Sequence, residues 1–238
     1  MIAAAALCPL APVLLPGLGG RTDTVPDLRR ACAAAVDALL AASPDEVVLL
    51  GEAAPAGEHQ VTPELGLHRF GVGAGTAARA APPGPAVPLP FVVGSVLLDA
   101  AGWSGPRRWL AVPSGPAGAA REGARLAAGP LRTAVLALGD GTACRTLKAP
   151  GHLDERAEAF DQALLVGVQT DLPSLLELDP ALASRLWVQG LAAWQALAGA
   201  LSLRHPAQGM DLLWAGDPFG VQYAVAQWPG DKEGSAVA

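Results

Sequence analysis

Short, uninterrupted runs of apolar residues are the feature that most limits how this chain can fold. The clearest are Ile2–Leu7, Glu46–Gly51 and Arg132–Leu138, which have the length of ordinary β-strands. The run Glu46–Gly51 is continuously apolar and does not alternate with polar residues, which is typical of a strand covered on both faces of its sheet. Covered strands need helices on both sides, so the pattern predicts an α/β fold.

A helix is expected between the first two of these strands. Thr24 is a suitable N-cap, Pro26 suits the first turn and Asp27 faces the positive end of the helix. Apolar residues then recur at helical spacing until Ser43-Pro44 ends the segment. Strand, helix and strand within the first fifty residues are the beginning of a βαβ unit.

The rest of the chain continues the alternation. Residues 52–90 are rich in Gly, Pro and Ala and are expected to form mostly loop. Further helices are expected at 91–101, 117–128 and, interrupted by Pro173 and Pro180, 154–201; further strands are expected at 107–112, 211–215 and 221–228. We therefore predict a single α/β domain over residues 1–228. It has a mostly parallel central sheet, helices on both faces and a C-terminal antiparallel hairpin, and residues 229–238 form a disordered tail.

Composition excludes several classes of function. The mean hydropathy of +0.34 reflects 50 alanines rather than a membrane segment, because the most apolar stretch, residues 1–20, is interrupted by three prolines. A net charge of -6 and a pI of about 5.1 argue against nucleic acid as a partner. Three cysteines are too few for a disulfide framework, so we expect a cytoplasmic protein. Assembly into a homo-oligomer is compatible with this composition.

Candidate chemistry gathers where strands end, because ligands of open α/β sheets bind at the carboxyl ends of the strands. The sharpest motif is Gly139-Asp-Gly-Thr-Ala-Cys-Arg145, directly after a strand. Asp140 is the candidate acid/base, although an aspartate in such a turn often only accepts hydrogen bonds from the turn itself. Cys144 is the candidate nucleophile, although a cysteine beside an apolar strand is more often a small core residue.

The remaining site predictions concern ligand and metal binding. Thr142, Arg145, Lys148 and Glu52 are candidate contacts to a small-molecule substrate. No cofactor is expected, and Fe(II) or Zn would bind only at a rearranged site made of Cys8, Glu52 and His59.

Several segments together resemble a known family. They are Cys8-Pro-Leu-Ala-Pro-Val-Leu-Leu-Pro16, Ala134-Val-Leu-Ala-Leu-Gly-Asp-Gly-Thr-Ala-Cys144, Phe160-Asp-Gln-Ala-Leu164, Asp171-Leu-Pro-Ser-Leu-Leu176, Trp194-Gln-Ala-Leu-Ala-Gly-Ala-Leu201 and Gly220-Val-Gln-Tyr223. In this order the chain resembles the class III extradiol ring-cleavage dioxygenases of the LigB type. Within that superfamily it is most similar to a short, alanine-rich actinobacterial branch.

The resemblance implies a non-haem Fe(II) site with two His ligands, one Glu ligand and a further catalytic His. The first His ligand would fall near Cys8 or Pro9, and the second His ligand near Ala53–Pro55. The Glu ligand would fall near Leu191 or Ala192, and the catalytic His near Cys144. None of those residue types is present there, and a facial triad needs all three ligands. The resemblance therefore implies the fold without the family's iron chemistry.

Three hypotheses follow. The first is a LigB-like domain that has lost its iron site and binds or transforms a small molecule at the strand ends. The second is an active metal-dependent oxidoreductase that uses the rearranged Cys8, Glu52 and His59 site. The third is a non-catalytic oligomeric scaffold subunit.

Overall fold

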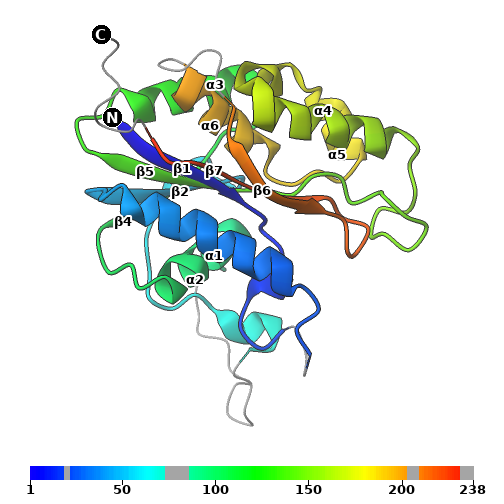
Figure 1. The fold of residues 1–238 in the computed structure, drawn as a ribbon, viewed down its shortest axis with the longest axis horizontal. Helices are drawn as coiled ribbons and strands as arrows, with labels where there is room; N and C mark the ends of the chain where they lie inside the picture. Colours follow the sequence, from blue (N-terminus) through cyan, green and yellow to red (C-terminus); the bar gives the residue numbers. More distant parts are fainter. Residues whose placement is uncertain (19–21, 73–85, 203–208, 231–238) are drawn as a thin grey trace.

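The structure, a computed structural model, describes residues 1–18, 22–72, 86–202 and 209–230. Over these residues the chain forms a seven-stranded mixed sheet between two layers of helices (Figure 1). Four central strands are parallel: β4 (Arg107–Ala111), β2 (Glu46–Gly51), β5 (Thr133–Leu138) and β1 (Ile2–Cys8). The α/β class predicted from the apolar runs is confirmed.

The edges of the sheet are antiparallel, which corrects the expectation of a mostly parallel sheet. On one side β6 (Asp211–Gly216) and β7 (Tyr223–Trp228) pair antiparallel, which confirms the predicted C-terminal hairpin, and β7 also pairs antiparallel with β1. On the other side β3 (Gly57–His59), within the segment expected to be mostly loop, pairs antiparallel with β4. Such a three-residue strand lacks the length from which a period can be read, so hydropathy patterns miss it.

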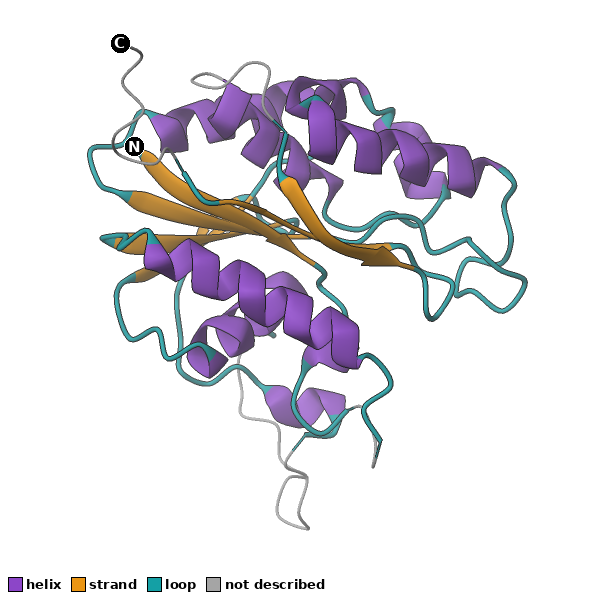
Figure 2. Ribbon diagram, in the orientation of Figure 1, coloured by secondary structure: helices purple, strands orange, loops and turns teal. Residues whose placement is uncertain are grey.

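Helices cover both faces of the sheet, as Figure 2 shows. One face carries α1 (Pro26–Ala41) and α2 (Leu89–Ala100). The other carries α3 (Pro116–Ala127), α4 (Arg156–Thr170), α5 (Pro180–Arg185) and α6 (Leu191–Ser202). Short 3-10 turns lie at η1 (Pro12–Leu14), η2 (Leu67–Phe70) and η3 (Leu172–Glu177). None of the described helices is long and apolar enough to cross a membrane.

Helix starts differ in detail from the sequence prediction. The first helix begins at Pro26, but Thr24 does not cap it. Instead the Asp23 carboxylate accepts the N–H of Val25 at 3.1 Å. The predicted tail lies mostly outside the described residues, which end at Gly230.

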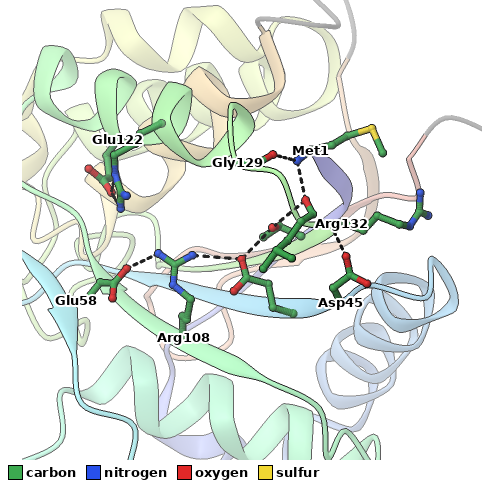
Figure 3. Close-up of polar contacts among 11 residues, drawn as sticks. Met1, Asp45, Glu58, Arg108, Glu122, Gly129 and Arg132 are labelled. Carbon is green, nitrogen blue, oxygen red and sulfur yellow. Dashed lines mark hydrogen bonds and ion pairs between the residues drawn. The ribbon is translucent and has the colours of Figure 1, made fainter.

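Charged groups gather at the amino end of the sheet, where the strands of the parallel set begin (Figure 3). Arg108 forms ion pairs with Glu46, at 3.2 Å, and with Glu58. The N-terminal amine donates to the carbonyl of Gly129 at 2.6 Å, and the Asp45 carboxylate accepts the N–H of Arg132 at 2.8 Å. These contacts tie the strand starts together and leave the opposite, carboxyl end for a ligand.

Helices α3 and α6 pack closely against each other. A Cβ placed on Gly123 would lie 2.0 Å from the carbonyl oxygen of Ala196, and one on Gly199 would lie 2.8 Å from the Cα of Ala120. Both distances are shorter than real Cβ contacts, so the two backbones approach only because glycine has no side chain. This contact fixes where α6 lies above the sheet.

Gly123→Ala is therefore expected to lower the free energy of unfolding by about 1–3 kcal/mol, because overpacking outweighs the ~1 kcal/mol gain in helix propensity. Urea denaturation followed by circular dichroism measures the change. Gly118→Ala, in the same helix, is the control, because its Cβ would come no closer to its neighbours than 3.3 Å, the distance to the ring of Pro113. Equal stability of the two variants would contradict the tight-contact explanation.

Candidate functional site

Two adjoining pockets lie at the carboxyl ends of the parallel strands. Their volumes are about 460 Å³ and 390 Å³, and both are lined by Glu52, Val188 and Gln189. The larger is also lined by Ser114, Gly115, Pro180, Ala183, Ser184, Trp187, Leu191, Ala192 and Gln195, and the smaller by Leu10, Ala53, Ala54, Pro88, Leu89, Pro90 and Gly190. Their position is the one that the strand-end rule predicts for a ligand site.

Glu52 directly follows β2 and lines both pockets. The neighbouring strand β4 ends at the same level of the sheet as β2, since Gly51 pairs with Ala111. The loop after β4 therefore brings Ser114 beside Glu52, and the Ser114 hydroxyl donates to the carboxylate at 3.2 Å. Glu52 is exposed, so its carboxylate is available to a ligand.

Asp140 lies immediately behind the smaller pocket. It follows β5 and is only 7% exposed. Its carboxylate accepts the N–H of Leu10 at 3.0 Å, and its own N–H donates to the carbonyl of Gln189 at 2.8 Å. Leu10 and Gln189 both line that pocket, so one layer of the wall separates Asp140 from it.

Burial sets the acidity of Asp140. Removal from water raises its pKa to about 7, and the hydrogen bond from Leu10 only partly opposes the shift. The same environment acts on Tyr223, whose pKa is raised mainly by burial and further by the charge of Asp140. A carboxyl group with a pKa near neutrality can both donate and accept a proton under physiological conditions.

Thr142 and Arg145 do not line either pocket but hold the loop that follows β5. The buried Asp161 of α4 accepts both the N–H of Thr142, at 2.8 Å, and its hydroxyl, at 2.7 Å. Arg145 lies 3.8 Å from Asp161 and 3.2 Å from Asp217 in the β6–β7 turn. Burial raises the pKa of Asp161 to about 6, against the effect of the Thr142 hydrogen bonds.

Gly139 and Gly141 allow close packing around the loop that follows β5. A Cβ on Gly139 would lie 2.3 Å from Nε1 of Trp194, and one on Gly141 would lie 2.7 Å from a carboxylate oxygen of Asp161. Asp161 was absent from the predicted site. A carboxylate between the apolar residues of a helix, here beside Phe160, is the signal that indicates such a buried role.

Cys144 is buried in the core between the loop and α5. Its Sγ lies 3.5 Å from the carbonyl oxygen of Leu186 and 3.6 Å from that of Gly151. Burial first, and then the charges of Asp154 and Asp161, raise the pKa of its thiol, which disfavours the thiolate that a nucleophile needs. Lys148 is exposed on the same loop and lines neither pocket.

The structure does not bring Cys8, Glu52 and His59 together. Cys8 is buried against Cys32 of α1, whose hydrogen bond is the largest cause of the raised pKa of Cys8. His59 lies in β3, with Nε2 2.8 Å from the carbonyl oxygen of Pro55 and its ring 5.3 Å from that of Phe91. Among the described residues, no group of three or more His, Cys, Asp or Glu side chains is placed to hold a metal ion.

The segment between α5 and α6 supplies pocket residues that the strand-end rule cannot find. Trp187, Val188 and Gln189 precede a helix and do not follow a strand. Asp140 forms a β-bridge with Gln189, and this pairing draws the segment to the carboxyl end of β5. The long separation in sequence is the reason that local patterns do not indicate the contact.

The fold and the site together define an α/β protein with a ligand-sized pocket at the carboxyl end of a mixed sheet. Comparison with known proteins adds nothing to this description: no family model matches the chain, and no curated protein matches it.

The raised pKa of Asp140 predicts how stability depends on pH. Its folded pKa of about 7 exceeds the ordinary value of 3.8, so the folded protein binds the proton more tightly than the unfolded chain does. The resulting contribution of Asp140 to the free energy of unfolding is complete below about pH 4. It is lost as the pH rises through 7, a loss of roughly 4 kcal/mol. Asp140→Asn, which cannot ionise, is expected to lose less stability than the wild type between pH 4 and 8.

Urea denaturation at several pH values measures this difference. Asp37→Asn, at an exposed position of α1, is the control and is expected to keep the wild-type dependence. An unchanged pH dependence in Asp140→Asn would show that Asp140 ionises in the folded protein at its ordinary pKa.

Proposed function

We propose that the protein binds a small molecule in the two adjoining pockets, using a LigB-like fold without the iron site of that family. The observation that carries the proposal is the place of the pockets, at the carboxyl ends of the parallel strands. Two of the positions at which the resemblance implies iron ligands line these pockets. Ala53 and Ala54 line the smaller one, and Leu191 and Ala192 line the larger one.

The side chains at these positions do not fit an iron centre. Alanine and leucine offer no ligand atom, Cys144 is buried in the core, and Cys8 packs against Cys32. What remains is a cavity of suitable size, with apolar walls and a few polar groups such as Glu52, Ser114 and Gln189. Pockets of this volume and lining are the usual form of small-molecule sites.

A second candidate function is acid–base catalysis by Asp140. It is favoured by the pKa of about 7 and by the contacts of Asp140 with Leu10 and Gln189, which line the smaller pocket. In this function Asp140 would exchange a proton with a ligand after a small movement of the wall. Cys144 would have no covalent role, because its buried thiol is outside the pocket lining.

Filling the larger pocket tests the proposal. Ser184 lines it from α5 and is exposed, so Ser184→Trp is expected to occupy the cavity without disturbing the core. In a fragment screen by nuclear magnetic resonance, fragments that bind the wild type are expected to lose binding at least about tenfold in this variant.

Ala181→Trp is the matched control, because Ala181 is exposed on the same helix and does not line the pocket. It is expected to bind the fragments as the wild type does. The proposal is wrong if fragments bind elsewhere on the protein, or if Ser184→Trp and Ala181→Trp bind them equally well.

A further inference from the structure

The charge at the pocket walls is one-sided. Among the described residues that line the two pockets, Glu52 is the only one with a charged side chain. None of the ion pairs between described residues includes it. Its carboxylate accepts a hydrogen bond from a neutral group, the Ser114 hydroxyl. A carboxylate in a cleft that forms no ion pair attracts a positively charged ligand, and the net charge of -6 adds to this field.

An aromatic side chain lines the same pocket. Trp187 is 54% exposed, although an indole of this size is usually buried. Its backbone adopts a φ of 58°, a left-handed conformation that is uncommon for residues other than glycine. Trp187 takes this conformation as the residue that closes α5, because the N–H of Val188 donates to the carbonyl of Ala183 at 3.0 Å in a Schellman motif. The end of α5 thus places an exposed indole in the pocket lining, and the face of an indole can bind a cation.

Among the described residues, no Lys or Arg side chain lines either pocket, although the exposed Arg185 directly follows Ser184 in α5. Arg145 is held by Asp217 and Asp161 beyond the pocket lining, and Lys148 lines neither pocket. Helices α3, α5 and α6 begin at the larger pocket and bring positive partial charge to it. However, the first residues of α3 and α5 are prolines, Pro116 and Pro180, which have no N–H to offer an anion. Glu52, an anion, lines the same pocket as these helix starts.

We propose that the pocket binds an organic cation, a substituted amine or quaternary ammonium compound, with the positive nitrogen between the Glu52 carboxylate and the Trp187 indole. The proposal presupposes the small-molecule binding argued above and names the class of ligand for the same pocket. The apolar walls formed by Ala183, Leu191 and Ala192 suit the carbon substituents of such a compound. Carboxylate and indole together distinguish it from a neutral or acidic molecule of the same shape.

Three probes of similar shape and different charge test the ligand class: benzyltrimethylammonium, benzyl alcohol and benzoate. Isothermal titration calorimetry with the full chain is expected to give the tightest binding for the ammonium compound, by about tenfold over benzyl alcohol. Benzoate is expected to bind most weakly because Glu52 repels it. Nuclear magnetic resonance of the indole N–H groups, with the Trp187 signal assigned from Trp187→Phe, locates the bound probe.

Variants separate the two contacts. Glu52→Gln keeps the size of the side chain and is expected to weaken binding of the ammonium probe about fivefold without changing that of benzyl alcohol. Trp187→Leu is expected to weaken the ammonium probe about threefold or more, whereas Trp187→Phe keeps an aromatic face and most of the affinity. Glu64→Gln, at an exposed glutamate outside both pockets, is the matched control and is expected to bind like the wild type.

Several results would overturn the proposal. Tighter binding of benzoate would identify the helix starts as an anion site, and equal binding of benzyl alcohol would show that charge is not recognised. Absence of binding by the ammonium probe would also overturn the proposal. In each case the fragment screen with Ser184→Trp still decides whether the pocket binds small molecules at all, so failure of the ligand class and failure of the proposed function are distinguishable.

Discussion

The parallel pairing of β4, β2, β5 and β1 is the constraint on which the rest of the structure depends. Because these strands run in the same direction, the segments that come after them all leave from one end of the sheet. Glu52, Ser114, Asp140 and Leu10 come from four distant parts of the sequence and meet there for that reason. The ion pairs of Arg108 hold the strand starts at the opposite end of the sheet (Figure 3).

The sequence predicts the parallel centre of this fold well, because its strands are long and apolar. Glu46–Gly51 has the predicted limits, and Ile2–Cys8 and Thr133–Leu138 differ from prediction by one residue. The antiparallel edges of the sheet are harder to predict from the sequence. β3 is too short to show a period, and the pairing of β7 with β1 depends on tertiary contacts that no local pattern records. The sheet is therefore mixed, although its best-predicted strands are all parallel.

The site was predictable only in part, for a physical reason. The strand-end rule finds Glu52 and Asp140, because it selects residues that come directly after a strand. It also selects Thr142, which turns out to bind Asp161 within the protein. It misses Trp187 and Gln189, which reach the pocket from the segment between α5 and α6. Whether a polar residue faces the ligand or the protein depends on the side chains around it, and their positions are known only after folding.

The glycine contact between α3 and α6 has a consequence beyond stability. Gly115, just before α3, and Leu191, the first residue of α6, line the same pocket. The distance between the two helix axes therefore contributes to the width of the cavity, and Gly123 and Gly199 allow that distance to be short. A methyl group added there would act as a wedge, altering which molecules fit while touching none of them.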